Sequence, residues 1–255
     1  MRVRADDHSP PPINFGDALF LDLDGTLAEI AASPHKVTVD PRIPAILLQA
    51  AERLDGALAV ISGRPIAQID RLLRPYAGAV AGIHGLERRD ASGRTMASAA
   101  APELDHARRV AAEFAAEHAG VTLEDKGLAL ALHYRGGPEH GAACRVVARA
   151  VATGRLTTQE GKMVIEIQPD GMDKGRTIRT YMDELPFRGR RPIYIGDDRP
   201  DEAGFDYVNK AGGLSVLVGP AFQSIARYRL AGVAEAIAWL DQFAFGAPAL
   251  ADTSA

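Results

Sequence analysis

Short apolar runs alternate with amphipathic segments in the first quarter of the chain. Residues 18–21 are all apolar and end in the polar sequence Asp22-Leu23-Asp24-Gly25-Thr26. A helical pattern with a proline in its first turn follows over 41–54, and a second apolar run covers 57–61. A buried strand followed by a helix and another buried strand is typical of parallel pairing, because the helix returns the chain to the edge where the first strand began.

The same alternation returns near the end of the chain. The pattern predicts four elements in order: a helix at 173–184, a strand at 192–195, a helix at 201–210 and a strand at 214–218. Both segments therefore belong to one α/β core with a Rossmann-like parallel sheet, which we assign to 17–101 and 170–245.

The segment between these two parts follows a different order. Its predicted elements are a helix beginning near 102, strands at 121–124 and 128–134, a helix at 138–153, and strands at 156–159 and 163–167. The strands alternate as in hairpins, which is typical of an antiparallel sheet with one covered face and one open face. We therefore expect 102–169 to form a smaller α+β cap domain inserted into the core.

The two ends of the chain show no regular pattern. Residues 1–16 interleave acids with three consecutive prolines, and 246–255 are small, polar and aperiodic, so we expect a loose leader and a loose tail. No apolar run approaches the roughly 18 residues that a membrane span requires, and the N-terminus lacks the apolar region of a signal peptide. A membrane is therefore not an expected partner.

Charge and cysteine content narrow the class of partner. The 255 residues carry a formal net charge of −4 and a pI near 6.0, which argues against a broad grip on nucleic acid. The single cysteine, Cys144, permits no disulfide within the chain and fits a reducing cytoplasm. We expect a cytoplasmic monomer whose partner is a small molecule.

The first strand carries two acids to its own end. Asp22 and Asp24 are two residues apart, and with the period-two alternation of a strand both carboxylates can point to the same side. Two such close carboxylates repel each other unless a cation or a shared proton intervenes. Gly25 permits a tight turn, and Thr26 offers a hydroxyl and an amide near a helix start. The alternative is an ordinary acidic turn that caps a helix.

Three further polar clusters lie at predicted junctions between strands and helices. They are Ser62-Gly63-Arg64, Lys174 within Asp173-Lys174-Gly175, and the run Gly196-Asp197-Asp198-Arg199-Pro200-Asp201-Glu202. Ligands of open parallel sheets bind outside the carboxyl ends of the strands. We therefore expect the four clusters to meet in one crevice.

Together these motifs resemble those of the haloacid-dehalogenase superfamily, in the same order along the chain. Four narrower matches resemble the trehalose-6-phosphate phosphatases: Ile83-His84-Gly85-Leu86-Glu87, the segment 161–169 with Lys162 and Glu166, the pair Lys174-Gly175, and the run 196–202. The resemblance covers residues 18 to 240. One departure is Pro200, where that family usually carries a threonine.

The resemblance implies roles for the core residues. Asp22 is expected to attack phosphorus and form an aspartyl phosphate, while Asp24 protonates the leaving sugar and then activates water. The expected metal is Mg²⁺, held by the Asp22 carboxylate, the Asp24 main-chain carbonyl and Asp197, with Asp198 beside them and Asp201 behind them. Phosphate oxygens are expected to meet the following residues: Thr26, Ser62, Gly63, Arg64 and Lys174. Arg64 has the alternative of pairing with an acid.

The cap is expected to determine specificity. Lys162 and Glu166 are four apart on one predicted strand, so they share a face and suit neighbouring sugar hydroxyls. A solvated strand face is the alternative. Further candidates for substrate contacts are His84, Lys126 and Arg135, with His133 as a weaker one. His84 has the alternative of a buried hydrogen bond inside the core.

The expected reaction is hydrolysis of trehalose 6-phosphate to trehalose and phosphate. Sucrose-phosphate and mannosyl-phosphoglycerate phosphatases are alternatives, because their cores would carry similar clusters and only the cap would differ. A phosphosugar mutase also uses an aspartyl phosphate and is a second class. A sugar-phosphate sensor without catalysis is a third class, which the nucleophile beside an acid argues against.

Overall fold

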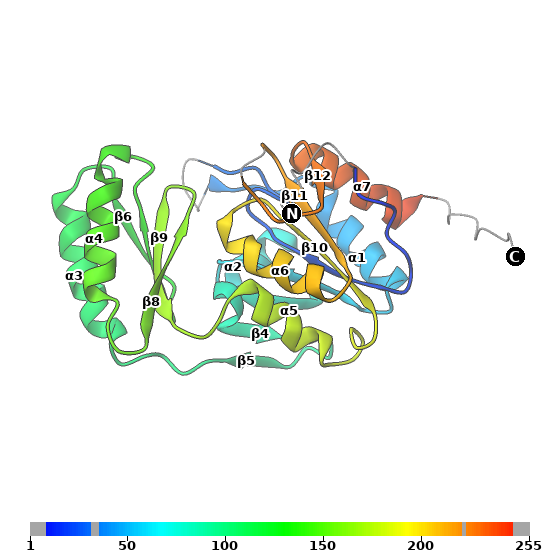
Figure 1. Ribbon diagram of the computed structural model, residues 1–255, viewed down its shortest axis with the longest axis horizontal. Helices are drawn as coiled ribbons and strands as arrows, with labels where there is room; N and C mark the ends of the chain where they lie inside the picture. Colours follow the sequence, from blue (N-terminus) through cyan, green and yellow to red (C-terminus); the bar gives the residue numbers. More distant parts are fainter. Residues whose placement is uncertain (1–8, 32–35, 221–222, 247–255) are drawn as a thin grey trace, which may run out of the picture.

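The computed structural model describes residues 9–31, 36–220 and 223–246. These residues form two sheets of different type, each with its own helices (Figure 1). The larger sheet contains β1 (Asp17–Leu21), β2 (Leu58–Ile61), β3 (Ala79–Gly82), β4 (Glu87–Arg89), β5 (Thr95–Ala97), β10 (Arg191–Gly196), β11 (Leu214–Val218) and β12 (Tyr228–Leu230).

The strands of the larger sheet follow the order β12-β11-β10-β1-β2-β3-β4-β5. All neighbours from β12 to β3 are parallel, and β4 and β5 continue the sheet as an antiparallel edge. The predicted α/β class with a parallel core sheet is confirmed. Because β1 lies between β10 and β2, the chain leaves β1 on one side and reaches its other neighbour only much later, which creates a switch point at the centre of the sheet.

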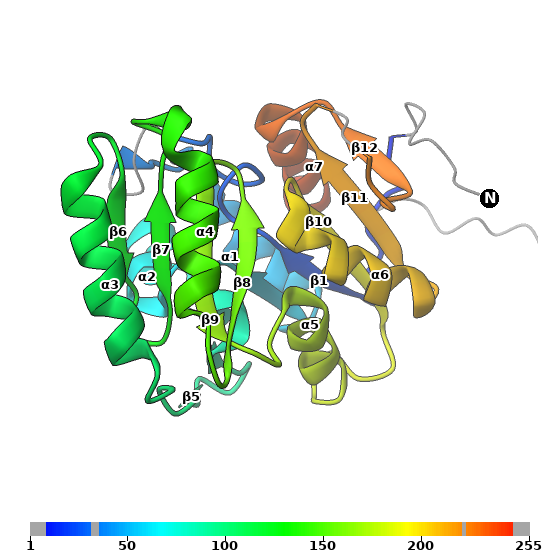
Figure 2. The ribbon, with the colours of Figure 1, turned by 60° about the vertical axis from the view of Figure 1, so that its left-hand side comes forward.

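Helices cover both faces of this sheet (Figure 2). They are α1 (Ile43–Arg53), α2 (Ile66–Leu73), α5 (Lys174–Met182), α6 (Glu202–Lys210) and α7 (Val233–Phe245), with short 3-10 segments η2 (Ile83–Gly85) and η4 (Arg199–Asp201). The sequence predicted four of the core strands and the helices α1, α5 and α6 within a few residues, but it gave no prediction for α2 or α7.

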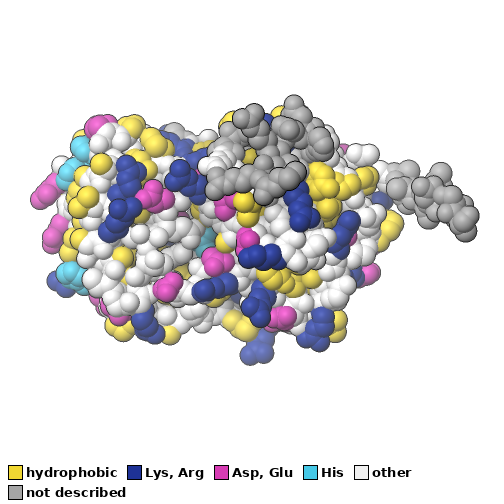
Figure 3. Space-filling view, in the orientation of Figure 1, with side chains coloured by type: hydrophobic (Ala, Val, Ile, Leu, Met, Phe, Trp, Pro, Cys, Tyr) yellow, Lys and Arg dark blue, Asp and Glu magenta, His cyan; other side chains and the backbone are white. Residues whose placement is uncertain are grey.

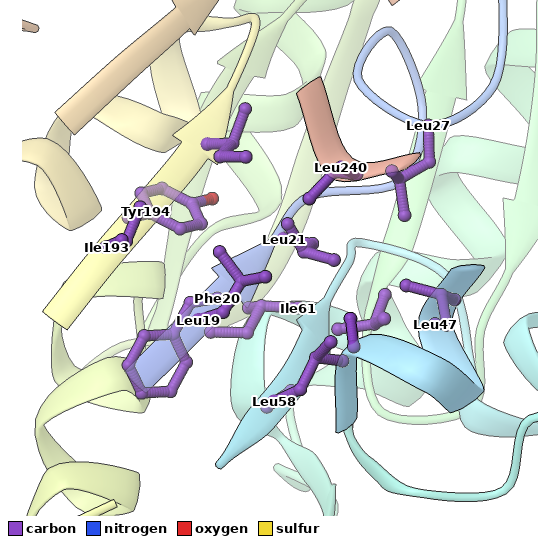
Figure 4. Close-up of a cluster of buried hydrophobic side chains, with 14 of the residues drawn as sticks. Leu19, Phe20, Leu21, Leu27, Leu47, Leu58, Ile61, Ile193, Tyr194 and Leu240 are labelled. Carbon is purple, nitrogen blue, oxygen red and sulfur yellow. The ribbon is translucent and has the colours of Figure 1, made fainter. Parts of the chain in front are cut away.

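Strand β1 shows how alternation fills the core. All five of its residues are buried. Phe20 stacks on Phe187 at a centroid distance of 5.3 Å and also contacts Tyr181 of α5. Leu21, the next residue, lies toward Leu240 of α7 (Figure 4). One apolar strand therefore supplies side chains to both covered faces, which explains its continuous rather than alternating hydrophobicity.

The smaller sheet lies in the segment inserted between β5 and α5. It has the antiparallel order β6-β7-β9-β8. The elements of this cap are α3 (Leu104–Glu117), β6 (Thr122–Asp125), β7 (Leu130–His133), η3 (Pro138–His140), α4 (Gly141–Val151), β8 (Leu156–Gly161) and β9 (Val164–Pro169). In Figure 1, α3 and α4 lie on the outer side of the cap sheet, and its other face is turned toward the core.

The period of two divides each cap strand between these faces. On β9, Ile165 and Ile167 join the hydrophobic cluster beneath α3 and α4, whereas Glu166 between them lines a cavity toward the core. On β7, Leu132 joins the cluster and His133 lines the cavity. The open face of the cap sheet therefore presents polar side chains to the core.

Two sequence expectations need correction here. The described part of the predicted loose leader is packed, since Pro10 and Ile13 are buried and Phe15 lies 6.1 Å from the ring of Phe243. Lys162 does not share a strand with Glu166, because it lies in the turn between β8 and β9, where Met163 has a φ of 62°. Residues 1–8 of the leader and 247–255 of the predicted tail lie outside the described residues.

The surface shows no single dominant chemistry on the face seen in Figure 3. Basic and acidic side chains of the described residues are interspersed there over both domains. Within the described ranges, no helix is both long enough and apolar enough to cross a bilayer.

Candidate active site

The carboxyl ends of β1, β2 and β10 meet below the open face of the cap sheet. A cavity of about 390 Å³ lies there and is lined by residues of both domains. All four polar clusters singled out in the sequence contribute to its wall, through Asp22, Ser62, Lys174 and Asp197. The register explains this meeting, because Leu21 pairs with Ile195, and Asp22 and Asp197 follow this pair by one and two residues.

Asp22 and Lys174 form a buried ion pair at the floor of the cavity. The Lys174 ammonium, on the first residue of α5, donates to Asp22 Oδ1 at 2.6 Å, and both residues are only 4% exposed. The Asp173 side chain caps α5 by accepting from the Arg176 amide. This N-cap hydrogen bond fixes the start of α5 and therefore the position of Lys174.

Asp201 organises the loop after β10. Its Oδ1 accepts from Lys174 and from the Tyr194 hydroxyl, while its Oδ2 accepts from the amides of Asp197 and Asp198 at 2.9 Å each. With four donors, this carboxylate is fully engaged inside the protein. Pro200 stands in the first turn of η4, a position that suits proline because its missing amide is not needed there.

Asp22, Asp197 and Asp201 form a buried acidic cluster. One carboxylate oxygen of each lies within 4.8 Å of the others, and the described residues contain no other such group. Burial raises the pKa of Asp22 well above its ordinary value, with the charges of Asp201 and Asp197 adding to it. Burial and the Asp201 charge also raise the pKa of Asp197 to about 6.

The cluster fits a divalent cation on chemical grounds. Hard carboxylate oxygens are the ligands that Mg²⁺ prefers, and acids whose pKa is raised by burial and by neighbouring carboxylates hold protons more readily unless a cation is present. Burial would lower the pKa of Lys174, but the charges of Asp201 and Asp22 raise it instead. Lys162 from the cap contacts Asp197 Oδ2. A left-handed turn at Gly25, with a φ of 89°, brings the backbone against the Asp197 carboxylate, where a Cβ would collide.

Asp24 lies at the same cavity with a different partner. Both of its oxygens accept from the Arg64 guanidinium, at 2.6 Å from Nε and 2.7 Å from Nη2. The acid-pairing alternative for Arg64 is therefore what the structure shows. Ser62 Oγ accepts from the Arg64 amide at 3.1 Å, which fixes the turn after β2.

Two predicted ligands have other contacts. Thr26 does not line the cavity; it is fully buried, and its hydroxyl donates to Asp22 Oδ2 at 3.3 Å. Asp198 lines the cavity, but its carboxylate lies outside the acidic cluster and accepts from the amides of Lys162 and Arg199. The Asp24 carboxylate also lies outside that cluster.

Glu166 is the central acid of the cap wall. It accepts from the Lys126 ammonium at 2.6 Å and lies 2.9 Å from Nε2 of His84, which belongs to the core. Lys126 also donates to the carbonyl of Gly63 in the core. Burial opposes ionisation of Glu166, but Lys126 and His84 outweigh it and lower its pKa. His84 does form a buried hydrogen bond, but its partner is Glu166 of the cap and not a residue of the core as the alternative supposed, so the bond joins the two domains.

Lys162 and Arg135 close the cavity from the cap turns. The Lys162 ammonium contacts both the carboxylate and the carbonyl of Asp197. Arg135 donates to the carbonyl of Ala31 in the core at 2.6 Å and to the carbonyl of Lys162. The predicted substrate contacts in the cap therefore all line one cavity, although no single strand carries them.

Comparison with known proteins supplies the deciding observation. The sequence model described as trehalose-phosphatase matches residues 20–234, which is most of the chain. The chain belongs to the trehalose-phosphatase family. The resemblance inferred from the motifs is confirmed.

Curated and solved relatives of this trehalose-phosphatase family member agree. The trehalose-6-phosphate phosphatase of Escherichia coli (strain K12) is 42% identical over 236 residues, covering 91% of this chain and 88% of that protein. The C-terminal domain of Candida albicans trehalose-6-phosphate phosphatase has a TM-score of 0.79 at 20% identity, covering 94% and 99%. A haloacid-dehalogenase-superfamily phosphatase from Bacteroides thetaiotaomicron has a TM-score of 0.60 at 19% identity, covering 90% and 95%. The last two show the fold alone.

Sequence reasoning missed several residues at this trehalose-phosphatase site, among them Glu124 and Tyr194. Glu124 on β6 lines the cavity and lies 2.9 Å from Nε2 of His133, and Tyr194 on β10 holds Asp201 from behind. The signal for Glu124 was its place two residues before Lys126, because side chains two residues apart along a strand point to the same face. Tyr194 sits within an apolar strand, where no local pattern distinguishes it from the core.

Proposed function

We propose that the chain is a phosphatase that hydrolyses trehalose 6-phosphate to trehalose and phosphate, with Mg²⁺ as its cofactor. The observation that carries this proposal is the buried Asp22–Lys174 pair at the floor of a cavity that the polar cap face closes. The named relatives act on trehalose phosphate, which supports the same substrate here.

The first chemical step assigns Asp22 as nucleophile. An Asp22 oxygen forms a bond to phosphorus, and the bond from phosphorus to the sugar oxygen breaks. Asp24 gives its proton to that sugar oxygen, so trehalose leaves as a neutral alcohol. Because the Asp24 carboxylate is paired with Arg64 here, this step requires the pair to rearrange when substrate arrives.

The second step reverses the part played by Asp24. It takes a proton from water while the water oxygen attacks phosphorus, and the bond from phosphorus to Asp22 breaks. Phosphate leaves and both aspartates return to their first state. Lys174 balances the charge of Asp22 in both steps, and Ser62 with the Gly63 and Arg64 turn supplies donors for phosphate oxygens.

The residues that would hold Mg²⁺ are the carboxylates of Asp22 and Asp197 with the main-chain carbonyl of Asp24. When bound, the ion would neutralise charge on the phosphoryl oxygens. Asp201 is assigned to ordering the loop and Lys174, because its oxygens are already engaged by four donors. Asp198 is assigned to the turn of the cap rather than to the metal.

The cap is proposed to select the sugar. Glu124 and Glu166 offer acceptors, and Lys126, Lys162 and Arg135 offer donors, which together match the alternating hydroxyls of a disaccharide. Sucrose-phosphate and mannosyl-phosphoglycerate phosphatases and a phosphosugar mutase are the outcomes against which this choice is tested. The cytoplasmic location and the monomer remain predictions from composition.

A panel of sugar phosphates with and without Mg²⁺ tests the proposal. We expect phosphate release to be fastest from trehalose 6-phosphate and to stop when the metal is removed. Asp22→Asn should lower turnover by at least about four orders of magnitude with the fold intact. Asp206→Asn, on the surface of α6, is the matched control and should retain full activity. Normal turnover by Asp22→Asn, or preference for another sugar, would contradict the assignment.

A further inference from the structure

A chain of hydrogen bonds crosses from the core to the cap beside the active site. Arg64, which binds both oxygens of Asp24, also donates from Nη1 to Gln68 Oε1 at 3.2 Å. Gln68 Nε2 in turn donates to Glu124 Oε1 at 3.4 Å, and Glu124 Oε2 lies 2.9 Å from His133. This series of hydrogen bonds therefore joins Asp24 of the core to Glu124 of the cap.

Gln68 occupies the middle of this chain without belonging to the site. It is half-buried in the first turn of α2, and it does not line the cavity that Asp24, Arg64 and Glu124 share. Arg64 and Gln68 are four residues apart around Pro65, where the helix begins. Any influence of Gln68 on the reaction must pass through its two neighbours.

Both ends of the chain are held in place. On the core side, the Arg64 amide binds Ser62 Oγ and the Arg64 carbonyl accepts from the Ile83 amide at 3.0 Å. On the cap side, burial opposes ionisation of Glu124, but the hydrogen bond with His133, the charges of Lys126 and His133, and the hydrogen bond with Gln68 together lower its pKa to about 2, so its carboxylate is ionised. Gln68 thus links a fixed cation to a fixed anion.

The amide group suits this position chemically. One end accepts from a guanidinium, which has no acceptor, and the other end donates to a carboxylate, which has no donor when ionised. A glutamate would repel Glu124, and a lysine would repel Arg64. Only a side chain with both functions satisfies both neighbours.

We propose that Gln68 is a positioning residue that couples Glu124 of the cap to Asp24 of the core through Arg64. The inference rests on the proposed function, in which Asp24 protonates the leaving sugar. Arg64 occupies both oxygens of Asp24, so the orientation of Arg64 governs whether the Asp24 carboxylate is free to contact the leaving sugar oxygen. A hydroxyl that binds Glu124 competes with Gln68 and changes the restraint on Arg64.

The first test separates acid catalysis from general damage by varying the leaving group. In Gln68→Met, kcat/KM should fall about tenfold on trehalose 6-phosphate, the loss expected for a hydrogen bond to a charged group. It should fall less on phenyl phosphate, and by less than about twofold on p-nitrophenyl phosphate, whose anion leaves without a proton. Gln49→Met is the matched control, because Gln49 is a half-buried helical glutamine that contacts Glu52 far from the site.

The second test is a double-mutant cycle with Glu124→Ala on trehalose 6-phosphate. Coupling predicts that the double variant loses less than the product of the two single losses. Equal losses of Gln68→Met on all leaving groups, no loss on any, or multiplicative losses in the cycle would each overturn the proposal. A wild-type chain that ignores trehalose 6-phosphate would instead overturn the proposed function, and the two aryl phosphates would still report on Gln68.

Discussion

The cavity has acids on two sides: Asp22, Asp197 and Asp201 of the core, here called the rim, and Glu124 and Glu166 of the cap, here called the wall. The pKa values of Asp22 and Asp197 are raised, whereas those of Glu124 and Glu166 are lowered. Burial and neighbouring acids raise the pKa of Asp22 and Asp197. In the cap, Glu166 is buried and Glu124 half-buried, but cationic and imidazole partners lower their pKa. The acids of the rim therefore have less positive charge beside them than their negative charge requires, whereas each acid of the wall already has a basic partner.

This difference teaches what each region is built to receive. A crowded acidic rim gains most from a divalent cation, which relieves repulsion that lysines alone leave in place. A wall of ionised and paired acids has fixed acceptors beside fixed donors, which suits neutral hydroxyls. Asp201 is the exception on the rim. Burial alone would raise its pKa, but Lys174 and the other hydrogen-bond donors lower it, which agrees with its assignment to ordering the loop and Lys174.

Removing the buried lysine that pairs with Asp22 and Asp201 is expected to give the largest effect. Lys174→Met leaves Asp22 and Asp201 without a counter-charge, so turnover should fall by at least about a thousandfold on trehalose 6-phosphate and on p-nitrophenyl phosphate alike. The uncompensated charges should also lower the free energy of unfolding by about 3–5 kcal/mol. Steady-state kinetics and urea denaturation measure the two effects.

Lys210→Met is the control for that change. Lys210 is exposed on α6 and pairs with the exposed Asp206 one turn away, so neither rate nor stability should change appreciably. A Lys174 variant that keeps its activity on either substrate would remove the contrast between rim and wall, because the rim would then work without its cation.

The sequence predicted the rim better than the wall for a physical reason. Asp22, Ser62 and Asp197 directly follow apolar strands, and parallel strands bring their carboxyl ends to one edge whatever the details of packing. The position of Lys174 depended only on a helix start with Asp173 as its cap. Local signals therefore placed these residues before any tertiary contact was known.

The wall depends on contacts that no local pattern contains. Lys162 reaches Asp197 from a hairpin turn, and the His84–Glu166 bond joins residues 82 positions apart across two domains. Gln68 reads as an ordinary polar residue of an amphipathic helix, and its partners lie on either side of the domain boundary. Such residues are specified by how the cap sits on the core, which the linear pattern does not encode.

Opening the wall at its central acid should give a smaller and selective effect. Glu166→Ala removes the acceptor that Lys126 and His84 hold, so kcat/KM on trehalose 6-phosphate should fall about a hundredfold, the loss of charge-assisted hydrogen bonds to the sugar. Activity on p-nitrophenyl phosphate should stay within about twofold, because that substrate has no sugar to bind. The matched control is Glu160→Ala on β8, which pairs with Arg149 on the exposed side.

If Glu166→Ala lowered kcat/KM equally on both substrates, the wall would serve the chemistry and not the selection of the sugar. If it lowered kcat/KM on neither substrate, the ionised face would be a structural feature of the cap. Both outcomes would erase the proposed division between the two regions.

The smallest expected effect is the pH dependence of the wall itself. The pKa of Glu124 falls from 4.5 to about 2, so its ionised form stabilises the folded state above pH 4.5, and this stabilisation is lost as the pH falls toward 2. Such a shift amounts at full strength to about 3 kcal/mol, and solvent in the cavity screens it, so we expect about 1 kcal/mol. Urea denaturation of the wild type and Glu124→Gln should therefore differ by this amount at pH 6.5, and the gap should narrow at pH 3.5. Exposed Glu139 provides the control substitution Glu139→Gln, with no such trend. A gap that stayed constant with pH would mean that Glu124 is held by shape rather than by charge, and the wall would then resemble an ordinary packed surface.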